Sequence, residues 1–431
     1  MISGLRLSFC LLLLTPGALA ATLSAGPADY QGVIASLRPG DTLQLAPGRY
    51  PYGLRLHGIQ GLPGSPVTIA GARGDAASVF LGVEGRNTVS IKNAAHIVIR
   101  DIEIDGRGAY VDGVKAEGTS RFAHHITLEN LYIHDLAAQQ QSVGISTKCP
   151  AWDWTVRGNR ITRVGTGMYF GQSDGSAPFV GGLIEGNLVS DTIGYNLQIK
   201  HQRVRAAVPG MPTEPRLSVI RRNRFSKAAN ASTGKAARPN VLVGHQPLEG
   251  PGRDDGYAIY QNLFYQNPSE ALLQGEGNLA VYSNLFVNTH AIDIPAITIQ
   301  PHKAEPRDVR VFFNTVLHPQ SGVRLVRRAT QTAAITRVAG NAVFAAQPLQ
   351  GVATGHNHTA DYATAATVLV APFSDPAHMS LRPRPGQLLG TAAQLDAFTD
   401  LPDYHLDYDG EARGDVAYGA YGRAEAGPPA R

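Results

Sequence analysis

A short recurring pattern is the feature of this sequence that most restricts its fold. In each copy, apolar residues are followed after one or two residues by an Asn or Asp, and then by another apolar pair. Successive copies lie 22 to 39 residues apart, and the nine polar positions are Asp101, Asn130, Asn159, Asn187, Asn223, Asn262, Asn284, Asn314 and Asn341. Repeats of this length are typical of solenoids, in which each repeat packs on its neighbours.

The apolar residues within each repeat indicate strands rather than helices. Short Val, Ile, Leu and Phe runs alternate with a period of two, and no segment sustains a 3.6-residue apolar face. The repeat therefore predicts an all-β fold, a single-stranded right-handed parallel β-helix (a solenoid). The recurring Asn has a physical role in this fold. Its amide can donate to and accept from the same side chain on the next coil, about 4.8 Å away, which predicts an Asn ladder.

The two ends of the chain differ from the repeats. Residues 1–20 combine one basic residue, an apolar run and a small-residue cleavage pattern, so they are predicted to be a signal peptide. Residues 21–60 are expected to form an N-terminal cap with the first coil, and residues 61–350 the β-helix. Residues 351–431, rich in Ala, Gly, Pro and Asp, are expected to form a C-terminal cap, because the open end of a solenoid exposes unpaired strand edges.

Composition narrows the class of protein. Lys and Arg number 38 against 34 Asp and Glu, a net charge of +4 that is far below the surplus of a dedicated nucleic-acid binder. No run after the signal peptide reaches about 18 apolar residues, so no membrane span is predicted. Cys149 is the one cysteine left after cleavage, which excludes an internal disulfide. We expect a monomer that is periplasmic or secreted.

Several segments of the chain resemble a known family. They are residues 37–50 (LRPGDTLQLAPGRY), residues 64–69 with 95–100, and the tail segments 407–413 and 419–422. They look like parts of secreted β-helix proteins of the pectate-lyase-like superfamily. The first is similar to the opening coil of the chondroitinase B and alginate lyase family (polysaccharide lyase family six). The resemblance implies a β-helix that acts on an acidic polysaccharide. The Asn-Lys-Ser and Arg-His-Gly strands that carry the lysine and arginine of chondroitinase B relatives are absent from this sequence.

The two longest repeats point to a functional face. Their extra residues, rich in Pro, Gly, Ala and charge, lie in 203–216, 226–239 and 247–256. Insertions in a solenoid become loops on one face, which is often the binding face. The neighbouring strands share a seven-residue frame at 196–202, 240–246, 270–276 and 296–302. Alternation turns one set of apolar residues inward and places Lys200, Gly244, Gln274 and Gln300 in one outward file.

The residues at this face can carry out acid–base chemistry on a sugar. We assign catalytic roles to Lys200, His201, His245 and Glu276. Substrate contacts are expected from Lys148, Tyr169, Asn196, Gln198, Gln274, Gln300 and His302. Bases of this type can remove the C5 proton of a uronate, while amides or a cation steady its carboxylate, and Tyr169 can return a proton to the leaving oxygen. No resident metal is assigned, although Glu249, Asp254 and Asp255 could supply oxygen ligands to Ca²⁺.

A polysaccharide lyase for an acidic polysaccharide is therefore the first hypothesis, and a C5-epimerase would use the same proton abstraction. Two alternatives remain. A β-helix glycoside hydrolase needs paired carboxylates, and this face offers only Glu276 with Asp255 on an insertion. A non-catalytic glycan-binding or assembly protein of the cell envelope would use the same surface.

Overall fold

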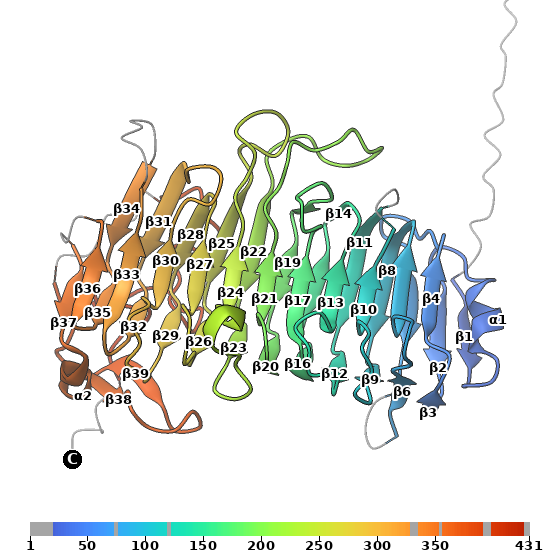
Figure 1. Cartoon of the computed structure of the whole chain (residues 1–431), viewed down its shortest axis with the longest axis horizontal. Helices are drawn as coiled ribbons and strands as arrows, with labels where there is room; N and C mark the ends of the chain where they lie inside the picture. Colours follow the sequence, from blue (N-terminus) through green and yellow to red (C-terminus); the bar gives the residue numbers. More distant parts are fainter. Residues whose placement is uncertain are drawn as a thin grey trace, which may run out of the picture.

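The computed structural model describes residues 20–72, 76–118, 122–327, 335–352, 356–390 and 398–425. Within these ranges the chain winds through three parallel sheets in a fixed order, and Figure 1 shows the successive coils stacked along the long axis. This is the predicted right-handed parallel β-helix. The predicted signal peptide lies outside the described residues except for Ala20. None of the helices in the described part of the chain is long and apolar enough to cross a lipid bilayer.

The first sheet begins each coil. Its strands are β1 (Thr22–Ala25), β2 (Thr42–Leu45), β5 (Val67–Ala70), β8 (Ala94–Arg100), β11 (Ala123–Glu129), β15 (Thr155–Arg157), β19 (Leu183–Glu185), β22 (Leu217–Arg221), β25 (Gly256–Tyr260), β28 (Leu279–Tyr282), β31 (Asp308–Phe312) and β34 (Ile335–Ala339). Two short strands extend this sheet beside β11, namely β14 (Ala151–Trp152) and β18 (Phe179–Val180).

The second sheet follows. Its strands are β3 (Gly48–Tyr50), β6 (Ser78–Leu81), β9 (Glu103–Asp105), β12 (Tyr132–His134), β16 (Arg160–Val164), β20 (Leu188–Thr192), β23 (Arg224–Ser226), β26 (Leu263–Tyr265), β29 (Leu285–Val287), β32 (Thr315–Leu317), β35 (Ala342–Phe344) and β37 (His358–Ala360).

The third sheet completes each coil. Its strands are β4 (Leu54–His57), β7 (Val89–Lys92), β10 (Val114–Ala116), β13 (Val143–Thr147), β17 (Thr166–Phe170), β21 (Leu197–Ile199), β24 (Val241–Val243), β27 (Leu273–Gly275), β30 (Ile297–Ile299), β33 (Ser321–Leu325) and β36 (Gln347–Gln350).

The Asn ladder runs through the turn between the first and second sheets. Each amide nitrogen donates to the amide oxygen of the next coil at 2.8 to 3.0 Å, along Asn159, Asn187, Asn223, Asn262, Asn284, Asn314, Asn341 and Asn357. Seven of the nine predicted positions belong to it, and Asn357 extends it.

Asp101 and Asn130 were wrongly predicted as ladder members. They lie one residue earlier, at a turn position with φ of 59° and 54°, where Leu131 follows and donates its backbone N–H to Asn159. Glycine fills the same turn position in the next coil, at Gly158 (φ 65°). Asp and Asn tolerate this left-handed conformation better than other side chains, which explains why they occur there. The Asn130 amide donates to the Asp101 carboxylate at 3.3 Å, so these two side chains connect their coils one position before the ladder.

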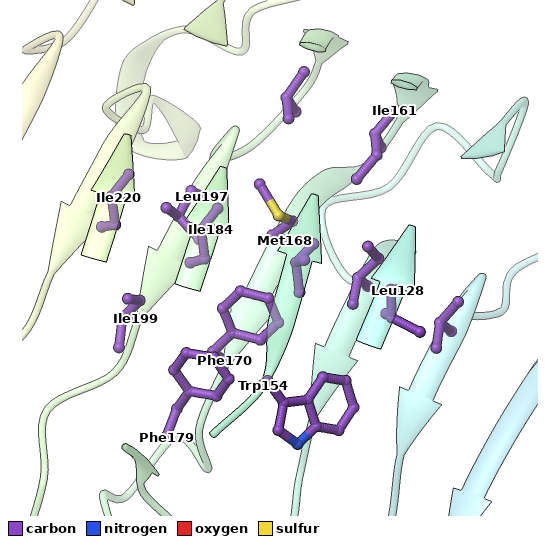
Figure 2. Close-up of a cluster of buried hydrophobic side chains, with 14 of the residues drawn as sticks. Leu128, Trp154, Ile161, Met168, Phe170, Phe179, Ile184, Leu197, Ile199 and Ile220 are labelled. Atoms are coloured by element: carbon purple, nitrogen blue, oxygen red, sulfur yellow. The ribbon is translucent and has the colours of Figure 1, made fainter. Parts of the chain in front are cut away.

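The core fills the interior of the coil with side chains from all three sheets. Phe170 stacks on Phe179 with ring centroids 4.3 Å apart, and Figure 2 shows these rings beside Met168 and Trp154. At the N-terminal end, α1 (Tyr30–Ile34) packs on the first coils. Its Tyr30 ring meets Tyr50 edge-on at 5.1 Å, and its hydroxyl donates to the Gly53 carbonyl.

The C-terminal segment folds back along the outside of the coils. It contains η2 (Tyr362–Thr364), α2 (Ala365–Val368) and the antiparallel pair β38 (Leu369–Ala371) and β39 (Ser380–Pro383). Phe398 stacks on Phe312 of the first sheet at 3.8 Å, which ends a ring stack that includes Tyr260 and Tyr282. Because these aromatic side chains point outward from the first sheet, the tail supplies the cover that they need.

Candidate functional site

Three long connections border the middle of the third sheet. Residues 200–216 join β21 to β22, and residues 244–255 join β24 to β25, so both leave the C-terminal ends of adjacent third-sheet strands. Residues 227–240, which contain η1 (Gly234–Ala236), enter the other end of β24. In Figure 1 long loops rise beside β22 and β25, while η1 lies by β23 and β24. Strand β24 is thus flanked by insertions at both ends, and β21 by one at its C-terminal end.

The connections 200–216 and 244–255 are held together by an ion pair. The Arg205 guanidinium and the Asp255 carboxylate form an ion pair in which both side chains are almost completely buried. Asp255 also accepts the backbone N–H of Arg216 at 2.8 Å. The Ca²⁺ site suggested for Glu249, Asp254 and Asp255 is therefore not supported, because both oxygens of Asp255 are already occupied. The Asp254 carboxylate lies 3.7 Å from Arg253 on the surface.

The register of the third sheet corrects one predicted file. Leu197, Val241, Leu273 and Ile297 are paired and buried, as expected for inward positions. However, Gln274 pairs with Leu242 and Thr298, at the outward position of Gln198. The predicted file of Lys200, Gly244, Gln274 and Gln300 is therefore wrong at Gln274, and Glu276 takes that place. A shift of two residues leaves every side chain on its own face, so the alternation could not reveal it.

We call six coils of the corrected file the third-sheet strip. It consists of the outward positions directly after the six successive third-sheet strands from β13 to β30: Lys148, Gly171, Lys200, Gly244, Glu276 and Gln300. Its members are about 4.8 Å apart, so the strip is about 24 Å long.

Gly244 must be glycine for the strip to form. A Cβ atom at this position would lie 2.3 Å from the backbone nitrogen of His201 on the preceding coil. The coil therefore passes close beside His201 only because Gly244 has no side chain.

Three imidazoles and a carboxylate gather at one part of the strip. The His201 and His245 rings stack with centroids 4.9 Å apart and an interplanar angle of 5°, and His302 lies 5.9 Å from His245. The His245 Nδ1 is 4.0 Å from a Glu276 oxygen, and the Gln274 amide donates to the other oxygen at 3.5 Å. Among the described residues, His201 Nε2 and His245 Nδ1 have no hydrogen-bond partner. The structure thus brings these predicted site residues together.

Burial and neighbouring charges shift the pKa of two basic groups here. Burial lowers the pKa of His201 to about 4, with further lowering by His245 and the lysines Lys200 and Lys303. Burial also lowers the pKa of Lys200, although the Glu276 carboxylate opposes that shift. A neutral imidazole at His201 can donate and accept hydrogen bonds at the same time, which suits it to hold a polar ligand.

A second group lies at the N-terminal end of the strip. The Lys148 Nζ is 3.4 Å from the centroid of the Tyr169 ring and donates to the Gly171 carbonyl at 3.5 Å. Burial lowers the pKa of Lys148 to about 7, with smaller contributions from the charges of Lys115 and Lys200. Burial raises the pKa of Tyr169. This pairing places a lysine that can be neutral near pH 7 beside a phenol that keeps its proton.

Sequence reasoning missed a buried carboxylate near Lys148, whose charge raises the pKa of that lysine against the effect of burial. The Asp112 carboxylate is 5% exposed and accepts the Ser146 hydroxyl at 2.7 Å and the backbone N–H of Val143 at 3.1 Å. It also lies 3.0 Å from the Lys115 Nζ. The third-sheet frame repeats around Lys115 and Lys148, and extending it in the N-terminal direction would have found these residues.

Two predicted substrate contacts do not reach the surface. Asn196 is fully buried in the turn before β21, where its amide donates to the Thr192 hydroxyl and the Ser226 carbonyl at 3.0 and 3.1 Å. It is a structural residue, and its assignment to substrate binding is wrong. Gln198 faces outward but is only 4% exposed, because Tyr169 and Leu242 flank it in register. Gln300 and His302 are more exposed, as predicted.

Comparison with known proteins places the fold but not the reaction. No protein-family model and no curated protein sequence matches the chain. A point mutant of the PL6 family alginate lyase AlyGC has a TM-score of 0.50 at 12% identity, and the match covers 78% of this chain and 51% of that one. An alginate lyase from Paenibacillus sp. str. FPU-7 has a TM-score of 0.49 at 15% identity, covering 79% and 98%. Pectate lyase Pel9A has a TM-score of 0.47 at 13% identity, covering 94% and 96%.

The AlyGC similarity, with a TM-score of 0.50, agrees with the three stacked parallel sheets described above. The chain spans about half the length of AlyGC, and an identity this low shows a shared fold alone. The chain thus has the right-handed parallel β-helix fold that its repeats and opening coil suggested.

Proposed function

We propose that this protein is a lyase that cleaves an acidic polysaccharide by removing the C5 proton of a uronate. The observation that carries the proposal is the pair formed by Lys148 of the third-sheet strip and Tyr169, whose ring lies 3.4 Å from the Lys148 Nζ. Lys148 has a pKa of about 7, so it can accept a proton near neutral pH. The raised pKa of Tyr169 keeps its hydroxyl protonated and able to donate. A base and an acid on neighbouring coils are the two groups that such an elimination requires.

The proposed reaction assigns each group one step. The Lys148 amine takes the C5 proton, the electron pair of that C–H bond forms the C4–C5 double bond, and the C4–oxygen bond breaks. Tyr169 gives its proton to the leaving oxygen. Lys200 and the imidazoles of His201 and His245 bind the substrate carboxylate, which lowers the barrier to proton removal. Gln300 and His302 contact the next sugar units along the strip.

A C5-epimerase would start with the same abstraction and return the proton to the opposite face of C5. Alginate and polygalacturonate are the first substrates to test, followed by glycosaminoglycans and bacterial exopolysaccharides. A lyase produces an unsaturated uronate that absorbs in the ultraviolet. An epimerase produces no chromophore but takes deuterium from solvent into the polymer. New reducing ends without the chromophore would indicate a hydrolase, and retention on glycan without products would indicate a binding protein. Either of these last two results refutes the proposal.

Arginine variants test the assignment of the base. Lys148→Arg keeps a long basic side chain, but the guanidinium is always protonated and cannot accept a proton, so we expect kcat to fall by about 10²-fold or more. Lys200→Arg is the matched control, because its proposed role needs only the charge, and it should retain most of kcat. Tyr169→Phe keeps the ring beside Lys148 and removes the proton donor. If Lys148→Arg turns over substrate like the wild type, Lys148 is not the base.

Export is part of the same proposal. The signal-peptide pattern of residues 1–20 supports secretion or a periplasmic location. We propose that the enzyme is a monomer there and meets extracellular polysaccharide. Amino-terminal sequencing of the protein from the expressing cell, with a start at Ala21, would support it.

A further inference from the structure

Three histidines form a cluster on the first sheet, away from the third-sheet strip. His96 lies in β8, and His124 and His125 lie in the adjacent β11. Each of them offers a ring nitrogen, and these three nitrogens all lie within 4.8 Å of one another. Nitrogen ligands about 2.1 Å from a tetrahedral metal ion are about 3.4 Å apart, so only small movements would be needed to close this group around an ion.

The contacts of His125 orient one nitrogen toward the centre of the cluster. Its Nδ1 is 2.8 Å from the Nδ1 of His124, while its Nε2 is 3.6 Å from an oxygen of Asp153. Asp153 is in turn ion-paired with Arg216. A carboxylate on the far nitrogen of a histidine is the usual support for a metal-binding imidazole.

Aromatic packing fixes His124. Its ring stacks on Trp152 with centroids 4.4 Å apart and an interplanar angle of 14°. The Phe122 ring centroid lies 5.6 Å from that of His124. The packing therefore holds the His124 ring in place, with its Nδ1 beside the Nδ1 of His125.

The backbone is unusual at two of the three positions. His96 and His125 have φ values of 52° and 51°, a left-handed conformation that is costly for most residues other than glycine. Their neighbours pair in register across β8 and β11, so the two irregularities lie side by side and direct both rings to the same place.

We propose that His96, His124 and His125 form a binding site for a divalent transition-metal ion of the zinc type. Three imidazoles are the donor set that zinc, nickel and copper prefer over calcium or magnesium. His125 is exposed, which leaves room for a water molecule as a further ligand.

A second cluster, Asp105, His134 and Asp135, also brings three ligand atoms within 4.8 Å. It is a weaker candidate because Arg163 binds both oxygens of Asp135. It serves instead as the internal control.

Calorimetric titration of the chelator-treated, full-length protein with ZnCl₂ tests the proposal. We expect one site with a dissociation constant in the micromolar range or below. The double variant His96→Asn/His125→Asn removes two ligands while Asn tolerates the positive φ, so binding should weaken at least about tenfold. The control His134→Gln should bind zinc like the wild type. Unchanged affinity in the double variant, loss of binding in His134→Gln, or no binding by the wild type would overturn the proposal.

A measurement on the wild type guards against a double variant that fails to fold. X-ray absorption of the zinc-loaded protein should show a nitrogen-rich shell with imidazole scattering. A shell made of carboxylate oxygens would refute the site. Cu²⁺ should also quench the fluorescence of Trp152, which stacks on His124, and Trp152→Phe should remove most of that quenching. Quenching that persists in Trp152→Phe would place the ion elsewhere.

Discussion

The Asn ladder allows a stability prediction whose size follows from counted hydrogen bonds. The Asn262 side chain is fully buried and makes five of them: its amide donates to Ile220, Tyr260 and Asn284, and its oxygen accepts the backbone and side-chain N–H groups of Asn223. At about 0.5–1.5 kcal/mol each, and with one backbone N–H left buried and unpaired, Asn262→Ala should lower the free energy of unfolding by about 3–5 kcal/mol.

Asn159 provides the matched control at the end of the same ladder. It is 1% exposed, but its side chain makes three such hydrogen bonds, to Leu128, Asn187 and the backbone of Leu131. Asn159→Ala should therefore cost about 2–3 kcal/mol. Equilibrium urea unfolding followed by circular dichroism measures both variants. If Asn262→Ala costs less than Asn159→Ala, the ladder does not stabilise the coil rung by rung, and the reasoning fails.

Three further substitutions test buried groups near the site. Lys227 is 1% exposed and burial lowers its pKa to about 7, so the unfolded chain binds more protons between about pH 7 and 10. Unfolding free energy should rise with pH across that window, and Lys227→Met should flatten the slope in urea titrations at several pH values. Arg205→Met leaves the buried Asp255 carboxylate without its ion-pair partner and should lower the free energy of unfolding by about 3–5 kcal/mol. Adding Asp255→Leu should restore much of that free energy, and no recovery in the same assay would contradict the prediction. Gly244→Ala places a Cβ atom 2.3 Å from the backbone nitrogen of His201 and should therefore lower the melting temperature. An unchanged melting temperature would contradict this prediction.

The fold could be predicted because its physical requirements repeat in every coil. The ladder asparagines recur at the same turn, and inward residues such as Leu197 and Val241 recur with period two, so the sequence shows one constraint many times. The exceptions, Asp101 and Asn130, occupy a turn position with positive φ, which Asp and Asn tolerate. This turn position and the ladder position are adjacent in the sequence, so residue type alone does not distinguish them.

The candidate site was harder to predict because outward positions carry no such repetition. Gln274 and Glu276 both face outward, so either satisfied the pattern, and only strand pairing decides between them. Asn196 looked like a surface amide, but the turn before β21 directs it inward to bind backbone groups. The pKa of Lys148 depends on burial by neighbouring coils, which the sequence does not display.

The two proposed sites are connected through one insertion, and this connection is testable. The strip residue Lys200 opens the connection 200–216, and Met211 in that connection packs with Trp152, the residue that holds His124. An ion that fixes His124 should therefore also restrain the packing of Trp152 and Met211. Zinc should slow hydrogen exchange at residues 206–213 in the wild type, because Met211 of this segment packs with Trp152. Met211→Ala should bind zinc with the same affinity but lose that protection. Equal protection in both proteins would show that the insertion senses the ion by another route, and no protection in the wild type would show that the two sites are independent.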